Sequence, residues 1–426
     1  MTELSLLNRT RPLGCEAIQM FGAARLEHQL TIGASGVTQE FAFELMARHD
    51  KAATMPRLIA AQGRATSSPA AAGCFADAAF AASFADLDNA WAGVTGLWTG
   101  NGGASVVPGL TTSRGAYVYT DRIPSPPVAR SDGGVRPILA GRSFAGAGGV
   151  NVAQLGNSVA TAADFTNWKN RAAGKARFRD HNTAGDQRSA SNWAATSTEV
   201  SRAMLVGAVF THDGPVANVM SLSDSELAGE GGGNTYAGEG MGLLACEAIN
   251  ALTPNTWMVH SGLAWSGQIS AAVQQRLIDL ISYGIIPDIL VFMAGSPNDT
   301  PNLGDPITTT VVNGWRAATG EILAICAEND ICPIIIPVLP SDYSVHQWGS
   351  TDSLRRSYNT EIRALANRGV FVADLDTAFS GAVDGNGQAT FNASYSTDLV
   401  HANDTGKAVG AALIQTEILK AVGGYL

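Results

Sequence analysis

The sequence has few charged residues and no excess of positive ones. Only 15 % of the 426 residues are charged, the formal net charge is −10 and the pI is near 5.2. Nucleic acids and anionic membrane surfaces bind proteins through basic patches, so we expect neither as a partner. Hydrophobic residues make up 46 % of the chain, which predicts a folded protein with a large core.

Long apolar runs are also missing. No stretch approaches the roughly 20 uninterrupted apolar residues of a membrane helix, so we expect no membrane insertion. The first residues, "MTELSLLNRTRPLG", lack the basic start and apolar core of a secretory leader. The compartment stays open: the protein is either not exported, or secreted or periplasmic after removal of a leader.

Cysteine is scarce, and no spacing typical of a metal site occurs. The five cysteines are an odd number without a CxxC pair, and Cys326 and Cys332 lie in or beside apolar segments, which favours buried free thiols over disulfides. The histidines show no HExxH spacing, and "DGNGQ" at 384–388 is too short for an EF-hand loop. We expect neither a metal nor another cofactor.

From Pro215 onward, apolar strands alternate with helical patterns. The expected strands are 215–222, 256–265, 287–295, 332–340 and 370–376, and the expected helices are 240–252, 268–284, 308–330, 351–369 and 404–422. Strands this uniformly apolar are buried on both faces, which requires helices on both sides of the sheet. Residues 206–426 are therefore predicted to form a three-layer α/β domain with about five parallel strands.

Residues 1–205 have a different pattern of apolar and turn-forming residues. Alternating segments at 37–48, 115–121 and 135–141 are separated by clusters of glycine, proline and serine, which is typical of antiparallel strands. This part is predicted to be a β-rich, sandwich-like accessory domain. The alanine-rich segment 67–93 is either a helix or an insertion, and 161–201 is predicted to be irregular.

Two short stretches place a serine in a context typical of an active site. In "SLSDSELAG" (221–229), Ser225 follows an apolar strand, and parallel sheets carry their chemistry beyond the carboxyl ends of their strands. In "TDSL" (351–354), Ser353 opens an amphipathic helix, and Thr351 or Asp352 is better explained as its N-cap. Ser225 is therefore the candidate nucleophile.

A nucleophilic serine needs a base and a carboxylate that orients the base. Of the seven histidines, only His401 has an acidic residue three positions earlier, Asp398, in the loop before the last helix. Acyl transfer also needs donors for an oxyanion, and Gly267 and Asn298 each follow a strand end. Taken alone, these two are explained equally well as a turn glycine and an Asn-Asp turn.

The four features, Asp224-Ser225, Gly267, Asn298-Asp299 and Asp398-x-x-His401, stand in order after successive strands. This order resembles the SGNH hydrolases, also called the GDSL esterase/lipase family, over about Pro215 to Leu426. The resemblance implies a flavodoxin-like αβα fold. It implies the following roles: Ser225 as nucleophile, His401 as base, Asp398 as its orienting carboxylate, the oxyanion hole from Ser225, Gly267 and Asn298, and loop bracing by Asp224 and Asp299.

Three positions depart from the family pattern. Ser223 stands where the Gly-Asp-Ser motif has glycine, and Gly295 lies one residue further from Asn298 than in Gly-x-Asn-Asp. Gly262 and Gly267 are both candidates for the glycine of the family's second motif, which contributes to the oxyanion hole. Gly267 is preferred because it adjoins a helix start. None of these departures removes a reacting group.

We expect an esterase that removes small acyl groups, most simply acetyl, from a carbohydrate, because the sequence has no long apolar lid segment for a fatty chain. A β-rich domain before an SGNH domain resembles the layout of several bacterial carbohydrate esterases. His346 and Trp348, in the loop after the fourth strand, are candidate substrate contacts. The alternatives are a lipase, arylesterase or thioesterase, or a non-catalytic glycan-binding module on a hydrolase scaffold. The oligomeric state is left open.

Overall fold

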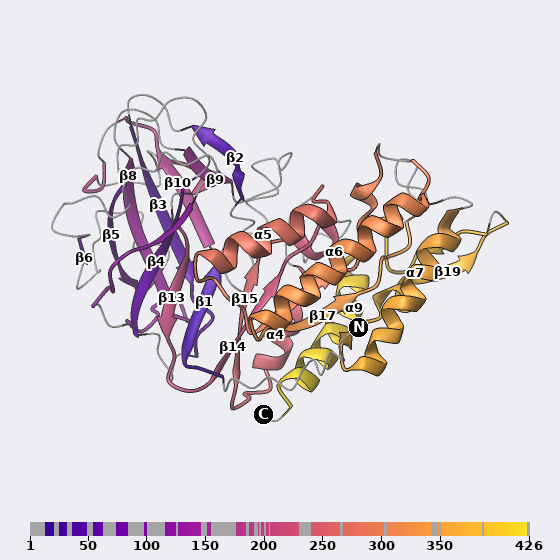
Figure 1. The fold of residues 1–426 in the computed structure, drawn as a ribbon. Coiled ribbons are helices and arrows are strands. Elements are labelled where there is room, and N and C mark those ends of the chain that lie inside the picture. The colour runs from indigo at the N-terminus through magenta and orange to yellow at the C-terminus, as the bar shows by residue number, and fades with distance from the viewer. Residues whose placement is uncertain are drawn as a thin grey trace. The chain divides into compact units, whose positions relative to one another are not determined.

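The structure is a computed structural model of the 426-residue chain. It describes residues 13–20, 25–31, 36–48, 54–62, 74–83, 98–99, 116–124, 127–145, 151–154, 176–184, 187–190, 195, 197–199, 202–203, 205–229, 240–264, 267–301, 305–341, 348, 351–385 and 387–423. The chain divides into two compact units, Gly14–Val216 and Ala217–Leu426 (Figure 1). Residues 205–211 form a strand of the first unit, so the division lies later than the expected 205/206 boundary.

The N-terminal unit contains two antiparallel sheets. The first has seven described strands: β1 (Glu16–Met20), β2 (Arg25–Thr31), β4 (Thr54–Gln62), β7 (Ala116–Tyr119), β9 (Asn151–Gln154), β12 (Arg202–Ala203) and β13 (Leu205–Thr211). The second has six described strands, in the order β11-β10-β3-β8-β5-β6: β3 (Val37–Glu44), β5 (Cys74–Ala81), β6 (Trp98–Thr99), β8 (Ile138–Ala145), β10 (Ala176–His181) and β11 (Ser197–Glu199). The predicted β-rich domain is confirmed.

Two expectations for this unit do not hold over the residues that the structure describes. Within the alanine-rich segment 67–93, Cys74–Ala81 form strand β5, which pairs with β8 over its whole length and is not helical. Within the segment 161–201, which was expected to be irregular, residues 176–181 and 197–199 form strands β10 and β11. Alanine has a low β-propensity, and pairing with β8 and burial of Phe80 override it.

A row of alternating charges crosses the second sheet on one face. Neighbouring strands place these residues opposite one another in register: Arg179, Glu40, Arg142 and Asp77. Arg179 Nη2 lies 2.8 Å from a Glu40 carboxylate oxygen, and the side chains of Glu40 and Arg142 have no exposed surface. A one-residue slip of any of these strands would separate the opposite charges, so this row favours one register.

The C-terminal unit is built on a parallel sheet. Its strands are β14 (Val216–Ser221), β15 (Trp257–Gly262), β16 (Ile289–Met293), β17 (Cys332–Ile336) and β18 (Phe371–Val372), in the spatial order β15-β14-β16-β17-β18. In chain order this arrangement is 2-1-3-4-5, the flavodoxin-like order, which confirms the predicted fold class. The order reverses between β14 and β16, and ligands of such sheets bind beyond the strand ends at this switch point.

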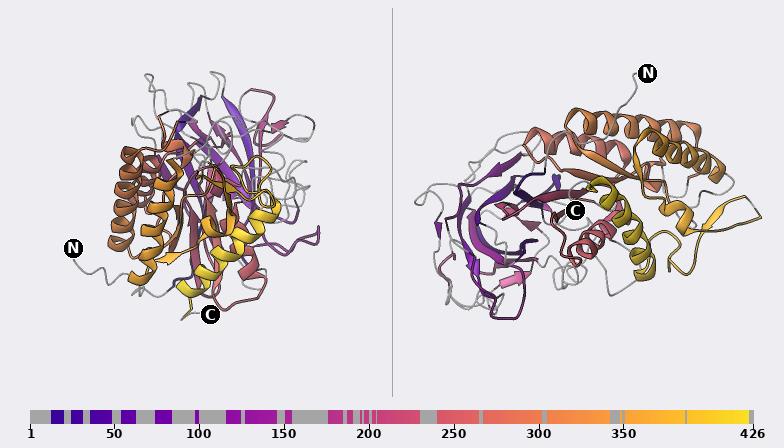
Figure 2. Two further views of the ribbon diagram at one scale, coloured as in Figure 1. Left: turned by 90° about the vertical axis from the view of Figure 1, so that its right-hand side faces the viewer. Right: turned by 90° about the horizontal axis from the view of Figure 1, so that it is seen from below.

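Helices cover both faces of this sheet. Figure 2 shows α5 (Ser270–Ser282), α6 (Thr309–Glu328) and α7 (Asp352–Ala364) along one face. The other face carries α4 (Met241–Asn250) and α9 (Asp404–Ala421), which pack against each other. Among the described residues of this unit, the other elements are α3 (Ser225–Ala228), α8 (Leu375–Phe379), the 3-10 turns η4 (Pro297–Asp299) and η6 (Leu365–Arg368), and the hairpin β19 (Ser380–Val383) and β20 (Ala389–Phe391).

The ends of some elements differ from expectation. β18 is a two-residue strand, because Asp374 caps α8 by accepting from the Thr377 N–H, and the chain turns helical there. Thr351 occupies the N-cap position of α7 but makes no side-chain capping bond, since its hydroxyl donates to the Trp348 carbonyl. Gly369 ends η6 with φ +84°, the left-handed conformation that is common for a glycine after a helix.

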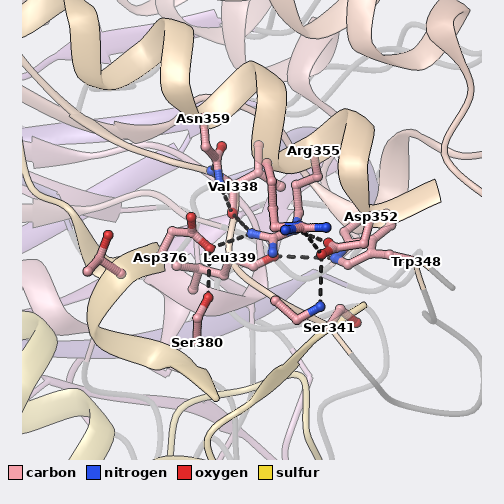
Figure 3. A network of polar contacts seen from close by, with 12 residues as sticks. Val338, Leu339, Ser341, Trp348, Asp352, Arg355, Asn359, Asp376 and Ser380 are labelled. Atoms are coloured by element: carbon pink, nitrogen blue, oxygen red, sulfur yellow. Dashed lines mark hydrogen bonds and ion pairs between the residues drawn. The ribbon is translucent and has the colours of Figure 1, made fainter. Parts of the chain in front are cut away.

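A buried polar network fixes the chain that follows β17 (Figure 3). Arg355 donates to Asp352 (2.5 Å), to Asp376 and to the Val338 carbonyl (2.8 Å), and Asn359 bonds the Val338 N–H and carbonyl. The side chains of Arg355 and Asp352 have no exposed surface. α7 and α8 are thereby tied to the segment that leaves the fourth strand of the sheet.

Candidate active site

Ser225 lies at the switch point of the parallel sheet. The chain continues from β14 through Leu222, whose N–H donates to the Val291 carbonyl of β16. Asp224 then adopts an extended conformation and caps α3 by accepting from the Glu226 N–H (3.1 Å). Ser225 is therefore the first residue of a short helix at the carboxyl end of a strand, and it is 7 % exposed.

The loop that carries His401 is folded around the Asp398 carboxylate. One oxygen accepts from the backbone N–H groups of Val400 (3.0 Å) and His401 (2.8 Å) and from the Ser396 hydroxyl (3.1 Å). The turn requires Leu399 at φ +62°, a left-handed conformation that is uncommon for a branched residue. Its backbone cost is offset by these hydrogen bonds, which aim the second Asp398 oxygen at the His401 ring.

Ser225, His401 and Asp398 form one continuous hydrogen-bonded chain. His401 Nε2 lies 3.0 Å from Ser225 Oγ, and His401 Nδ1 lies 2.7 Å from Asp398 Oδ2. The predicted contact between Ser225 and His401, 176 positions apart in sequence, is thus confirmed. Burial opposes ionisation of Asp398, but hydrogen bonds from His401 and Val400 outweigh it and hold the pKa of the carboxyl well below its usual range.

A second hydrogen-bonded chain connects the Asp224 and Asn298 segments. The Ser296 hydroxyl donates to Asp224 Oδ2 (2.5 Å) and accepts from the Asn298 side-chain amide (2.9 Å). That amide also lies 3.4 Å from the Gln268 carbonyl, next to Gly267. Burial raises the pKa of Asp224 to about 6, and the Ser296 hydroxyl opposes that rise, so Asp224 is an acceptor at neutral pH. The three predicted motif segments are therefore adjacent.

Asp299 braces three elements. Its carboxylate accepts from the backbone N–H and the hydroxyl of Ser270 (2.8 and 2.6 Å), which fixes the start of α5. It also accepts from the Ser296 N–H (3.0 Å) and the Trp315 ring N–H (2.8 Å). This contact set agrees with the bracing role that the resemblance implies.

Gly267 and Gly262 differ in conformation and surroundings. Gly267 is exposed, has φ +74°, and has no atom within 4 Å of the position a Cβ would take. Gly262 is the last residue of β15, where a Cβ would lie 3.3 Å from the His260 ring. The left-handed conformation at an open position favours Gly267 over Gly262 as the oxyanion-hole residue, an assignment that stays a prediction.

The two candidate substrate contacts, His346 and Trp348, are not placed at the site by this structure. His346 lies outside the described residues. Trp348 is 1 % exposed, and its ring lies edge-on to Trp315 with centroids 6.1 Å apart. Trp348 is thus a core residue in this structure and does not present its ring to a ligand.

A second serine–histidine contact lies close by in the sequence. Ser221 Oγ is 2.9 Å from His260 Nε2, but Ser221 has no exposed surface, and burial lowers the pKa of His260 to about 3. A Cβ on Gly242 would lie 2.2 Å from Ser221 Oγ, so α4 leaves no room for a substrate there. This pair connects β14 to β15 and is structural.

Sequence reasoning missed several residues that shape the site. Ser296 connects Asp224 to Asn298, and Lys407 directs its ammonium to the Gly229 carbonyl at the end of α3 (2.7 Å). Glu226, one residue after Ser225, is 3 % exposed. Only Ser296 had a sequence signal, since it lies within the motif segment 295–299 that departs from the family spacing.

In the part of the chain that the structure describes, no group of three or more His, Cys, Asp and Glu side chains could hold a metal ion. None of the helices described is long and apolar enough to cross a membrane.

Comparisons with known proteins give similarity for about half of the chain. No protein-family model and no curated protein matches it. Among solved structures, it is similar to a putative acylhydrolase from Bacteroides fragilis (17 % identity, TM-score 0.37, 48 % of this chain and 88 % of that one). It is also similar to a GDSL-like lipase from Bacteroides thetaiotaomicron (18 % identity, TM-score 0.37, 48 % of this chain and 89 % of that one). A third similar structure is the acetyl xylan esterase AlAXEase (19 % identity, TM-score 0.36, 47 % of this chain and 99 % of that one). The N-terminal unit is not identified by these matches.

Proposed function

We propose that this chain is a serine esterase that hydrolyses small acyl esters, acetyl above all, of a carbohydrate. The observation that carries the proposal is the chain Ser225 Oγ–His401 Nε2 (3.0 Å) and His401 Nδ1–Asp398 Oδ2 (2.7 Å) at the switch point of a parallel sheet. Nucleophile, base and orienting carboxylate in this geometry are the parts that acyl transfer requires.

In the first half of the reaction, Ser225 Oγ attacks the ester carbonyl carbon while its proton moves to His401 Nε2. Asp398 keeps the ring oriented and stabilises the imidazolium. The backbone N–H groups of Ser225 and Gly267 and the amide of Asn298 are proposed to bind the oxyanion. The tetrahedral intermediate collapses, the bond to the sugar oxygen breaks, and that oxygen takes the proton from His401.

In the second half, water attacks the acyl-enzyme. His401 removes a proton from the water, and a second tetrahedral intermediate forms and collapses. The bond to Ser225 Oγ breaks, Ser225 recovers its proton from His401, and the carboxylic acid leaves. No cofactor is consumed in either half.

The acyl preference is supported by the sequence, which has no long apolar lid segment for a fatty chain. The carbohydrate acceptor is proposed from the β-rich unit that precedes the parallel-sheet unit in the chain. A lipase, arylesterase or thioesterase would use the same three side chains and differ in the acyl chain or leaving group accepted.

Two assays separate these outcomes. Acetate release from acetylated polysaccharide tests the acceptor, and p-nitrophenyl esters from acetate to octanoate test the acyl pocket. We expect acetate release and a kcat/KM that falls with chain length. Faster turnover of octanoate than of acetate would support the lipase alternative, and no ester hydrolysis at all would support the non-catalytic module.

A further inference from the structure

Lys407 is a buried lysine beside the candidate active site, and the proposed reaction does not use it. It lies in the first turn of α9, shortly after His401, and is only 1 % exposed. Its ammonium donates to the Gly229 carbonyl at the end of α3 (2.7 Å). Burying a lysine costs desolvation of the ammonium and side-chain entropy. A lysine kept at such a cost indicates a specific use for its ammonium.

The nucleophile side of this contact is one closed helical turn. Gly229 is buried and ends α3 with φ +81°, and its N–H donates to the Ser225 carbonyl. The last carbonyls of a helix have no intrahelical partner, and a lysine ammonium is a favourable donor to them. Two hydrogen bonds in series therefore connect Lys407 to the backbone of Ser225, through Gly229.

The base side is the loop 395–403, which is fixed to the start of α9. The Asn403 N–H donates to the Tyr395 carbonyl (2.7 Å), and the Asn403 side chain caps α9 by accepting from the Gly406 N–H (3.0 Å). Gly406 packs so closely on the loop that a Cβ there would lie 2.4 Å from the Tyr395 carbonyl oxygen. The loop that carries His401 and the first turn of α9 thus form one packed segment.

We propose that Lys407 is a positioning residue that holds α3 against the first turn of α9 and thereby sets the distance between Ser225 Oγ and His401 Nε2. This inference rests on the proposed function. The Ser225–His401 bond joins the two segments at one point, and the Lys407–Gly229 bond joins them at a second. Two points of attachment restrict rotation of one segment against the other. Proton transfer from serine to imidazole depends on this geometry, so Lys407 should act on kcat.

Lys407→Met keeps an unbranched side chain of similar length and removes the donor. Without the second attachment, Ser225 and His401 are less often in reach of each other, so kcat on p-nitrophenyl acetate should fall about 10- to 100-fold, with KM changed less than about twofold. The unfolding temperature should fall no further than in Ser221→Ala, which also leaves one buried hydrogen-bonding group without its partner.

Rescue by a free amine tests the donor itself. Lys407→Ala removes three methylene groups and the ammonium, which are the heavy atoms of propylammonium. Propylammonium should therefore raise kcat of this variant about threefold or more. Tetramethylammonium carries the same charge without an N–H donor, and at equal ionic strength it should restore no activity.

The control is Lys420→Met on the same helix, because the Lys420 side chain is 56 % exposed and its ammonium bonds Glu417. This variant should keep kcat within about twofold of the wild type. An unchanged kcat in Lys407→Met, a loss of kcat no larger than that of Ser221→Ala, or equal rescue by the two cations would overturn the proposal.

Hydrogen exchange separates this proposal from the proposed function. If Lys407 connects the two segments, exchange in residues 225–229 and 395–407 should rise together in Lys407→Met, while β16 keeps its protection. A wild type that hydrolyses no ester but shows this paired rise would contradict the esterase and support the connection. An active wild type whose Lys407→Met variant exchanges like the wild type would refute the connection and leave the esterase standing.

Discussion

At the scale of single residues, two serine–histidine pairs lie within one unit and differ in what surrounds them. The Ser225–His401 pair is partly exposed and ends on the Asp398 carboxylate, whereas Ser221 and His260 are buried beneath α4. A hydroxyl–imidazole distance of about 3 Å is common to both, so distance alone does not identify a nucleophile. Exposure at a strand end and a carboxylate behind the imidazole distinguish Ser225.

The two serines give a matched pair of variants. Ser225→Ala removes the attacking oxygen and should lower kcat by about 10⁴-fold or more on p-nitrophenyl acetate. Ser221→Ala removes a structural hydrogen bond, so it should lower the unfolding temperature while kcat stays within about threefold. Equal losses of kcat in the two variants would show that this assignment is wrong.

Ser296 provides a second residue-scale prediction. Ser296→Ala breaks the connection between Asp224 and Asn298, so the amide proposed for the oxyanion hole loses its orientation, and kcat should fall about 10- to 100-fold at nearly constant KM. Thr308→Ala is the control, because Thr308 also caps a helix, α6, through its hydroxyl. A Ser296→Ala variant that matches Thr308→Ala in kcat would contradict the positioning role.

At the scale of secondary-structure elements, the C-terminal unit contains both buried and exposed ion pairs. Arg355 lies between Asp352 and Asp376 without exposed side-chain surface and ties α7 to α8. Arg316 and Glu361 join α6 to α7 on the surface, with side chains 41 % and 48 % exposed. Solvent screens the second pair, whereas the first has no water to replace a lost partner.

We therefore expect different costs from the same substitution. Arg355→Met removes the buried cation that Asp352 and Asp376 share and leaves them only the partly exposed Arg356 and Arg363, so it should lower the free energy of unfolding by about 3 kcal/mol. Arg316→Met should change it by about 0–1 kcal/mol. Urea denaturation of both variants measures the difference, and similar midpoints would refute the structural role given to the buried network.

The elements of the C-terminal unit could be predicted from the sequence because local signals suffice there. Apolar runs such as 287–295 and the amphipathic helix at 268–284 have the periodicity of the structures they form. Contacts between distant segments were predictable only where a family pattern supplied them, as for Ser225 and His401. The Ser296 connection and the burial of Glu226 depend on tertiary packing, which no local periodicity encodes.

At the scale of the whole molecule, the two units differ in the kinds of residue that form their cores. The C-terminal unit buries mostly apolar parallel strands between helices, whereas the second sheet of the N-terminal unit buries a charge row beside alanine and phenylalanine. That row was not foreseen, because Glu40 and Arg179 lie far apart in sequence and each alone is typical of a solvated position. Strand β5 was missed for a related reason, since its alanines gain β-structure only through pairing.

Breaking the charge row should destabilise the N-terminal unit. Glu40→Gln leaves the buried Arg179 and Arg142 side chains without their shared carboxylate, and we expect a loss of about 3–5 kcal/mol. Glu16→Gln is the control, because the Glu16 side chain is 52 % exposed and lies 3.9 Å from its arginine partners. Calorimetry with hydrogen exchange on β3, β8 and β10 measures the effect, and unchanged protection in Glu40→Gln would contradict it.

The central claim, that Ser225 is a nucleophile activated by His401, is tested most directly by covalent labelling. A fluorophosphonate reagent should modify the intact protein once, and peptide mass spectrometry should find the adduct on Ser225. The adduct should persist in Ser221→Ala and disappear in Ser225→Ala. An adduct on another residue, or none in wild-type protein that hydrolyses p-nitrophenyl acetate, would contradict the account.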